Sequence, residues 1–526
     1  MAAVIPSTTA NLPEPVQQLI AAGAAALQQQ QAGMAEQTLR KALAAAPGSS
    51  EVLRLLGIAL RLQNRNAEAL EMLRQAAALT PDDALIQNGL GTALDAEGDR
   101  DGAIAAFQRA CELAPQLGQL WANLGKSLSH DGRFAEAVPA LERALALADH
   151  SATRLRLAYA LRVLGDIDGA AQRYRELIAR NPADGTAWLG LAGLKTRPFA
   201  QADIAAMENV LHNAALSADE RISLGFALAK AFDDHERYPQ AFAMLEQANR
   251  QTRQIRPWSA AQFSLLTDAV LAAFAQKPAG APNEQGGEVI FIVSLPRAGS
   301  TLTEQILASH SEVEGAGELD DMTAVIVAES NRRRQAFPFW VGAATPQDWQ
   351  RLGAEYLART ARWRRERPRF TDKLPGNWLR VGAALAMLPG ARVIDCRRDP
   401  LESCFSAYRT LFSAGTQPFS YDLDDLAAYW HDYDRTCRHW QAMYPTAFRA
   451  QSYEALVAEP EAQIRELLEF CGLPYEPACA RFHETRRNVR TASASQVREP
   501  MMRDTARAAK YGALLDGLRA ALSASR

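Results

Sequence analysis

A repeat of 34 residues runs through the first 200 residues of this 526-residue chain. Three sets of residues follow the repeat, one of prolines and two of small residues. The prolines are Pro47, Pro81, Pro115 and Pro182, and the small residues are Gly57, Gly91, Gly125, Ala158 and Ala192, and Ala35, Ala69, Ala103, Ala137 and Ala170. In all three sets, one spacing late in the series is one residue shorter than the repeat requires, which we call the slip. Because independent sets share one period and one slip, we interpret this region as an array of helical hairpins.

The packing of helical hairpins explains these residue types. A single hairpin cannot bury its apolar face, so neighbouring hairpins must stack. Small residues let two helices approach closely, and proline ends a helix because it lacks an N–H group. The period and the positions resemble those of tetratricopeptide repeats (TPR), which implies a TPR helical array over residues 1–199. The resemblance also implies that the groove of the array binds a protein partner.

The repeat fades after Lys195, but the helical pattern continues. We expect residues 200–276 to form a helical bridging or capping segment that contains one more hairpin, over residues 223–250. Residues 277–287 (KPAGAPNEQGG) have the composition of a linker. A second domain is therefore expected over residues 288–526.

The second domain opens with the sequence EVIFIVSLPRAGST. Residues 288–293 are apolar and rich in β-branched side chains, which predicts a buried strand. Pro296 and Gly299 break this strand, and residues 301–310 return to a helical spacing. A turn between a strand and a helix N-terminus favours bound anions, and Arg297 adds a guanidinium that suits phosphate or sulfate. The stretch therefore predicts an anion-binding loop.

The loop lacks the lysine that follows the last glycine of a nucleotide-triphosphatase loop, since Ser300 follows Gly299. A P-loop kinase or NTPase is therefore disfavoured, although it stays an alternative.

PRAGST resembles the loop of sulfotransferases that use 3′-phosphoadenosine-5′-phosphosulfate (PAPS). The resemblance implies an α/β, P-loop-like domain with a parallel sheet, and a loop that holds the 5′ end of PAPS with Pro296, Arg297, Ala298, Gly299, Ser300 and Thr301. Many relatives have serine where this chain has Ala298, so this loop has one side-chain donor fewer.

Two later stretches also resemble this family. Residues 391–399 (ARVIDCRRD) read as a buried strand that ends in arginines, and a helical pattern follows over residues 401–412. The resemblance implies that Arg398 and Ser406 bind the 3′-phosphate; the alternative for Arg398 is a surface ion pair with Asp399 or Glu402. Tyr453 lies at the end of a predicted strand over residues 447–454, at the position of an aromatic residue near the adenine; a core tyrosine is the alternative.

Beside Arg297, the main catalytic candidates are Glu318 and Lys373. An attacking hydroxyl must lose its proton, and the resemblance to tyrosylprotein sulfotransferases implies that Glu318 takes it. The alternative is helix capping, for which Asp320 and Asp321 are the first candidates; His310 is a second candidate base. Lys373 matches a lysine that, with Arg297, stabilises the charge on the departing phosphate. Its alternative is a solvated loop lysine.

The late segment 487–500 (RNVRTASASQVREP) is polar and rich in hydroxyl groups. It resembles the segment that closes over the donor in these enzymes. Arg490, Ser493, Ser495 and Gln496 are therefore candidates for donor or transition-state contacts, with Ser493 preferred. Lys510 either reaches the 3′-phosphate or is a surface residue.

The bulk composition excludes some classes. The chain has 57 Lys and Arg against 60 Asp and Glu, for a net charge of −3, which gives no reason to expect nucleic-acid binding. Its 6 cysteines form no CxxC pair and read as small core residues. We expect no metal site, no signal peptide and no transmembrane helix, and hence a cytoplasmic protein without membrane contact.

These features together predict a PAPS-dependent sulfotransferase that moves a sulfuryl group to an acceptor hydroxyl. A peptide or protein tyrosine recruited by the TPR array is one acceptor; glycans and small molecules stay open, as does the oligomeric state. The alternative from another class is a TPR scaffold whose second domain binds a nucleotide without turnover.

Overall fold

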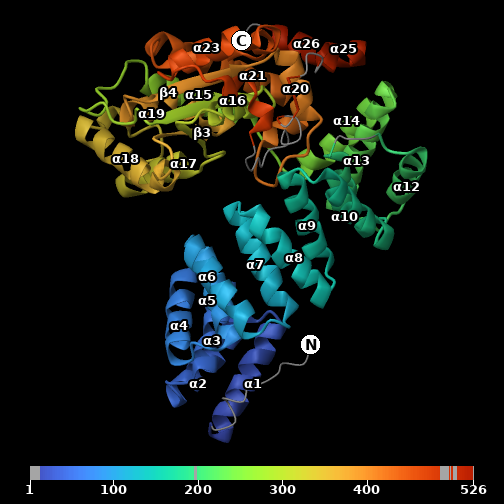
Figure 1. Ribbon diagram of the computed structural model, residues 1–526, viewed down its shortest axis with the longest axis vertical. Coiled ribbons are helices and arrows are strands. Elements are labelled where there is room, and N and C mark those ends of the chain that lie inside the picture. Colours follow the sequence, from blue (N-terminus) through green and yellow to red (C-terminus); the bar gives the residue numbers. More distant parts are fainter. Residues whose placement is uncertain (1–11, 195–197, 486–496, 498, 502–505, 525–526) are drawn as a thin grey trace. The chain divides into compact units, whose positions relative to one another are not determined.

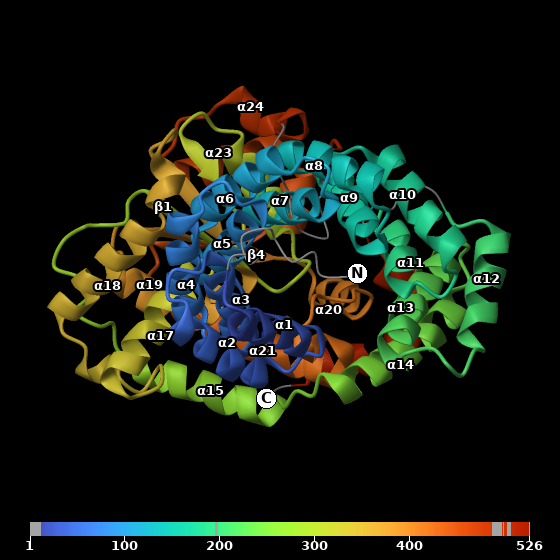
Figure 2. The ribbon, with the colours of Figure 1, turned by 90° about the horizontal axis from the view of Figure 1, so that it is seen from below.

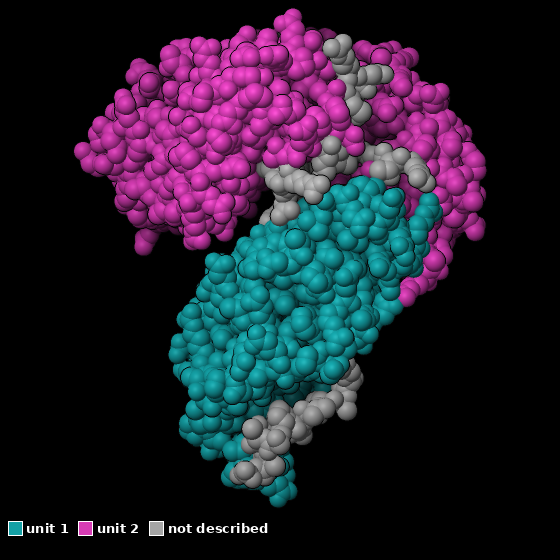
Figure 3. All heavy atoms as spheres, viewed as in Figure 1, with its two compact units in different colours: residues 1–177 teal, residues 178–526 magenta. Residues whose placement is uncertain are grey.

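The structure is a computed structural model that describes residues 12–194, 198–485, 497, 499–501 and 506–524. The chain divides into two compact units, residues 1–177 and residues 178–526, coloured teal and magenta in Figure 3. Each unit is described by itself.

Unit 1 is a series of antiparallel helical hairpins (Figure 1 and Figure 2). The paired helices are α1 (Glu14–Gln28) and α2 (Ala32–Ala45), α3 (Ser50–Leu62) and α4 (Asn66–Leu79), α5 (Ala84–Glu97) and α6 (Arg100–Leu113), α7 (Gly118–Asp131) and α8 (Phe134–Leu147), and α9 (Ser151–Leu164) and α10 (Ile167–Arg180).

The small residues of the repeat lie where two helices of a hairpin meet. A Cβ atom on Gly57 would lie 2.7 Å from Cγ of Leu73, and one on Gly125 would lie 2.6 Å from Cγ of Leu141. The slip of one residue lies in the turn between α8 and α9, which spans residues 148–150, whereas the turn between α4 and α5 spans residues 80–83. The predicted helical repeat array is thus confirmed.

Unit 2 begins with further helices and continues into an α/β domain. The first helices after the unit boundary are α11 (Gly185–Ala192), α12 (Gln201–Leu211), α13 (Ala218–Asp234), α14 (Tyr238–Ile255) and α15 (Ala260–Ala273). The segment 277–287 then packs against the α/β domain: the N–H of Ala281 donates to the carbonyl of Ala386 at 2.8 Å, and Gln285 Nε2 donates to the carbonyl of Met387 at 2.8 Å.

The α/β domain is built on a five-stranded sheet in the order β2-β3-β1-β4-β5, with every pair parallel. The strands are β1 (Val289–Ser294), β2 (Val313–Gly315), β3 (Arg369–Lys373), β4 (Arg392–Arg397) and β5 (Phe448–Ser452). Strand β1 is buried along its whole length, as its apolar sequence predicts. Ile292 pairs with Lys373 on one side and with Ile394 on the other, which fixes the register at the centre of the sheet.

Helices cover both faces of the sheet, as crossover connections between parallel strands require. The remaining helices are α16 (Ser300–Ala308), α17 (Asp321–Arg333), α18 (Pro346–Arg359), α19 (Val381–Met387), α20 (Pro400–Tyr408), α21 (Leu423–Met443), α22 (Tyr453–Ala458), α23 (Pro460–Phe470), α24 (Pro477–Ala480), α25 (Ala508–Tyr511) and α26 (Asp516–Ser523), with short 3₁₀ turns that include η4 (Pro375–Arg380). On one face, Ile290 and Ile292 pack with Ile306 of α16 and Leu467 of α23. The predicted fold class, a TPR array followed by an α/β domain with a parallel sheet, is confirmed.

The strand order places a crevice between two loops. The chain runs from β1 through α16 to β2 and β3 on one side of β1, whereas β4 pairs with its other side. The loops that follow β1 and β4 therefore leave the carboxyl edge of the sheet in opposite directions. Ligands bind open α/β sheets at such a switch point.

The hairpin α13–α14 packs against α20, which starts at this crevice. Asn249 of α14 is fully buried, and its Nδ2 donates to the carbonyl of Tyr408 at 3.0 Å. Asp233 of α13 accepts hydrogen bonds from Arg409 Nη2 at 2.7 Å and from the hydroxyl of Tyr511 at 2.8 Å. These contacts hold the end of α20 against α13 and α14.

Candidate active site

The anion-binding loop predicted from the sequence connects β1 to α16 at the crevice. Gly299 is the N-cap of α16, with a φ of 97° that favours glycine. A Cβ atom there would lie 2.8 Å from Cδ2 of Tyr453, so the ring also excludes a side chain. Ser300 and Thr301 form the first turn of α16, and the N-cap residue itself is a glycine without a side chain. The helix N-terminus therefore favours a bound anion at this point.

The charges of two further arginines act on Arg297 in this loop. Arg297 has a φ of 69°, and its Nε donates to Oγ of Ser406 at 3.3 Å. Burial, together with the nearby charges of Arg398 and Arg409, lowers the pKa of Arg297 to about 10. Arg409 is paired with Asp233, and Arg398 lies near Glu402, but the charges of both arginines still act on Arg297. A bound anion would therefore be stabilised here by charge as well as by the helix dipole.

Arg398 and Tyr453 lie together beside the loop. The Arg398 guanidinium lies over the Tyr453 ring, 4.9 Å from its centroid, and 3.5 Å from the Glu402 carboxylate. The structure therefore brings the predicted 3′-phosphate residues Arg398 and Ser406, and the predicted adenine neighbour Tyr453, into contact with the predicted 5′ loop.

A pocket of about 140 Å³ opens between this loop and the end of β4. Leu295, Ala298, Cys396, Arg397, Arg398, Pro400, Ser403, Trp430 and Tyr433 line it. The Ser403 side chain is buried, and its hydroxyl has no hydrogen-bond partner among the described residues. Ser403 is not among the residues predicted from the sequence, although it stands three residues, about one helical turn, before Ser406.

Glu318 and Lys373 form an ion pair at the carboxyl end of β3, next to β1. The distance from Lys373 Nζ to Glu318 Oε1 is 2.5 Å, and the Lys373 side chain is 1% exposed against 50% for Glu318. Lys373 is therefore not a solvated loop residue. Asp320 is the N-cap of α17, but its side chain makes no capping hydrogen bond. Asp321 accepts a hydrogen bond from the side chain of Arg359, at 3.3 Å from Nε, and this bond does not cap the helix. The capping expected of Asp320 is thus absent, because its backbone already has a helical conformation there.

Other candidates lie away from this site or outside the described residues. His310 is fully buried; its Nε2 hydrogen-bonds the carbonyl of Pro474 at 3.0 Å, and its Nδ1 accepts from the N–H of Glu312 at 3.1 Å. Lys510 is exposed on α25. The residues that the structure describes do not include Arg490, Ser493, Ser495 and Gln496.

A buried carboxyl group lies next to Lys373 on the opposite face of β3. Asp372 is fully buried, and its Oδ2 accepts a hydrogen bond from the hydroxyl of Tyr356 at 2.7 Å. Burial raises the pKa of Asp372 to about 8. The sequence did not predict that the neighbours Asp372 and Lys373 lie in different environments, since this difference depends on how helix α18 packs on the sheet.

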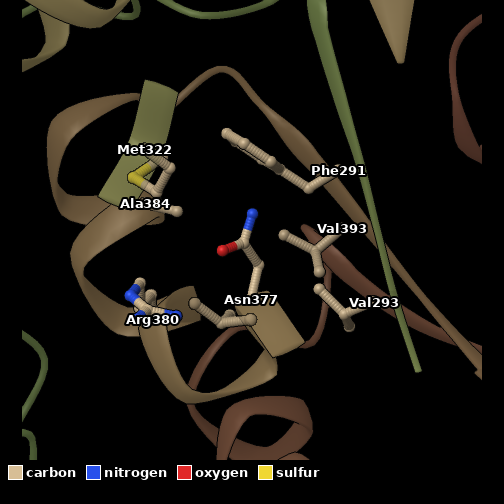
Figure 4. A pocket seen from close by; sticks show the side chains of 8 residues that line it. Phe291, Val293, Met322, Asn377, Arg380, Ala384 and Val393 are labelled. Carbon is tan, nitrogen blue, oxygen red and sulfur yellow. The ribbon is translucent and has the colours of Figure 1, made fainter. Parts of the chain in front are cut away.

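A smaller cavity of about 10 Å³ lies on this same face of the sheet, between β1, η4 and α19 (Figure 4). Asn377 points into it, is 3% exposed, and makes no side-chain hydrogen bond within the described part of the chain. Phe291, Val293, Met322, Arg380, Val381, Ala384 and Val393 complete the lining. The volume is that of about one water molecule, so the cavity is too small for an acceptor.

The residues that the structure describes contain no group of three or more His, Cys, Asp and Glu side chains placed to hold a metal ion. No helix among them is both long enough and apolar enough to cross a lipid bilayer.

Comparison with known proteins divides the chain in the same way as the fold. Residues 289–477 match the sulfotransferase family, which covers the sheet and the whole crevice. Residues 20–152 match the tetratricopeptide repeat in three overlapping stretches, and residues 128–194 match a second description of that repeat.

Similar individual proteins are also known. An uncharacterized protein of Aquifex aeolicus (strain VF5) is 31% identical over 376 residues, which are 68% of this chain and 48% of that protein, so the chain spans about half of its length. Two solved structures resemble the chain: PilF of Pseudomonas aeruginosa (22% identity, 48% of this chain, 98% of that chain, TM-score 0.33) and the TPR protein YrrB (19%, 39%, 95%, 0.29). From the family matches, the chain is a tetratricopeptide repeat protein that carries a sulfotransferase-family domain.

Proposed function

We propose that this protein is a PAPS-dependent sulfotransferase that transfers a sulfuryl group to an acceptor hydroxyl. One observation carries the proposal: Arg297 and Arg398 lie at the loop that leads into the N-terminus of α16, at the switch point of the sheet. The match to the sulfotransferase family supports the same reaction class.

The residues present at the crevice fit PAPS. The loop 296–301 would hold the 5′-phosphosulfate through backbone N–H groups, hydroxyl groups and Arg297. Arg398 and Ser406 would bind the 3′-phosphate, and the Tyr453 ring offers an apolar surface to the adenine. PAPS supplies the activated sulfuryl group, and all other chemistry falls to the protein.

The ion pair at β3 suits the transfer step. The bond between sulfur and the bridging phosphate oxygen breaks as the acceptor oxygen bonds to sulfur, and Glu318 takes the acceptor proton. The half-exposed Glu318 carboxylate can meet an acceptor from solvent, while the buried Lys373 ammonium keeps its place. Lys373 and Arg297 would stabilise the charge that develops on the phosphate. Ser493 is proposed to assist them from the late segment.

The proposed acceptor is a peptide or protein tyrosine, brought to the site by the TPR array. The repeat families matched by residues 20–194 support an interaction with a protein. We place the reaction in the cytoplasm, since all 6 cysteines are buried and unpaired, as is usual in a reducing compartment.

The test is a calorimetric titration of the full chain with 3′-phosphoadenosine 5′-phosphate (PAP), the product nucleotide, compared with ATP. We expect PAP to bind tightly, ATP to bind weakly, and Arg398→Ala to lose most of the PAP affinity. Arg438→Ala is the matched control, because Arg438 is 72% exposed on α21 and pairs only with Asp434 among the described residues. An intact protein that fails to bind PAP would overturn the proposal.

A second measurement separates the alternatives. PAP release from PAPS, with phenol as a probe acceptor, should fall by about a hundredfold or more in Glu318→Gln, within the range for a lost general base. Binding of PAP without any turnover would favour the scaffold alternative instead. Magnesium-dependent turnover of ATP would favour a kinase or NTPase.

A further inference from the structure

A buried carboxylate on α16 contacts the two elements that carry the ion pair. Glu304 is 2% exposed and lies one helical turn after Ser300. Among the described residues, its Oε1 accepts hydrogen bonds from the N–H of Gly317 at 2.8 Å and from the hydroxyl of Thr371 at 3.0 Å. Because buried carboxylates are costly unless hydrogen-bonded, both donors stabilise Glu304 in this position.

Both donors stand next to a proposed catalytic residue. Gly317 directly precedes Glu318, and Thr371 lies two residues before Lys373, on the same face of β3. The N–H of Lys373 also donates to the carbonyl of Gly317 at 2.9 Å. One carboxylate oxygen therefore links the helix of the phosphosulfate loop, the segment that carries Glu318, and the strand that carries Lys373.

Gly317 makes this link conformationally specific. Its φ is 76°, in the left-handed region, while a Cβ atom there would meet no atom within 4 Å. The backbone turn at this residue points its N–H toward Glu304 and lets Glu318 reach Lys373. If Glu304 lost its carboxylate, its side chain would no longer hold the turn at Gly317. The position of the ion pair relative to the loop would then lose this link to α16.

We infer that Glu304 is a positioning residue for sulfuryl transfer, which holds Glu318 and Lys373 in place relative to the loop that begins at Arg297. The inference rests on the proposed function and adds to it a residue outside the loop, the 3′-phosphate site and the ion pair. Glu304 touches neither nucleotide nor acceptor on this account; it acts through Gly317 and Thr371.

The experiment uses the full chain with Glu304→Ala, Glu304→Gln and Thr371→Val. Glutamine keeps an oxygen that can accept from both donors, alanine removes it, and valine removes one donor with little change of shape. Glu329→Gln is the control, because Glu329 is equally buried (1% exposed) but pairs with Arg332, Arg333 and Arg351. Each variant is measured for PAP affinity by calorimetry, for kcat and KM with PAPS and phenol, and for its melting temperature.

We expect kcat to fall by about tenfold to a hundredfold in Glu304→Ala, because a misplacement of about 1 Å has an effect of that size. PAP affinity should change by less than about twofold, since the nucleotide residues stay in place. Glu304→Gln should recover most of the activity, and Thr371→Val should show a smaller loss in the same direction.

Several results would overturn the inference. One is an unchanged kcat in Glu304→Ala. Another is a loss of kcat that comes with an equal fold-loss of PAP affinity, or with a fall in melting temperature and a loss of kcat like those of the control Glu329→Gln. If Glu304→Ala does not fold, Thr371→Val decides by the same criteria. Failure of the proposed function looks different, because the unmodified chain itself would then bind no PAP or release none from PAPS, and the inference would fall with it.

Discussion

At the scale of single residues, Gly299 is fixed by both conformation and space. Alanine at this position would adopt an unfavourable φ and bring its Cβ to 2.8 Å from the Tyr453 ring. We expect Gly299→Ala to lower the free energy of unfolding by about 1–3 kcal/mol and to weaken PAP binding. Gly376→Ala is the control, since no atom lies within 4 Å of its Cβ position and its φ is not positive. Urea unfolding and calorimetry of both variants check this, and equal behaviour would contradict it.

Asp372 predicts a pH dependence of stability. Its pKa of about 8 in the folded protein lies above the ordinary value of 3.8, because burial disfavours the charged form. Between these two values the folded state holds one more proton than the unfolded state, so this group's contribution is full below about pH 4 and is lost as pH rises through 8. The slope is at most about 1.4 kcal/mol per pH unit.

The variant Asp372→Asn removes the titrating group and keeps an oxygen for the Tyr356 hydroxyl. We expect the free energy of unfolding of the unmodified chain to fall more steeply than that of Asp372→Asn between pH 5 and pH 8. Urea unfolding at several pH values measures both slopes. Parallel curves would show that Asp372 is ionised in the folded protein.

At the scale of elements, the sequence was most informative where apolar runs are continuous. The strand expected over residues 288–293 is β1 (Val289–Ser294), and the one expected over 391–399 is β4 (Arg392–Arg397). Strand β2 (Val313–Gly315) was not predicted, since three residues carry too little pattern. Long-range partners such as Tyr356 and Asp372 could not be predicted either, because they meet only once the helix is packed on the sheet.

The contact of α13 with α20 gives a prediction at this scale. The Asp233 side chain is 3% exposed and binds Arg409, whose charge acts on Arg297. Asp233→Ala leaves that arginine without its carboxylate, so we expect a loss of about 3 kcal/mol in the free energy of unfolding and a change in PAP affinity. Asp219→Asn, an exposed residue in the first turn of α13, should change stability by less than about 0.5 kcal/mol. Equal stability of the two variants would refute the role of Asp233.

At the scale of the whole molecule, the helices before the sheet belong to the same compact unit as the sulfotransferase-family domain. A fragment of residues 288–526 loses α13 and α14, and exposes surface of α20 that they cover. We expect this fragment to aggregate or to melt at a lower temperature than a fragment of residues 178–526. Light scattering and thermal unfolding of both fragments provide the test, and equal melting temperatures would show that α/β folding is independent of these helices.

The docking of α13 and α14 on α20 also has a consequence for how such a chain can change length. Hairpins of unit 1 each contact their neighbours in the series, so a whole hairpin can be gained or lost there with one interface replacing another. The hairpin α13–α14 has no such freedom, because Asn249 and Asp233 bind particular groups at the end of α20. The number of repeats can therefore change in unit 1, whereas the hairpin α13–α14 must be kept together with the α/β domain that it contacts.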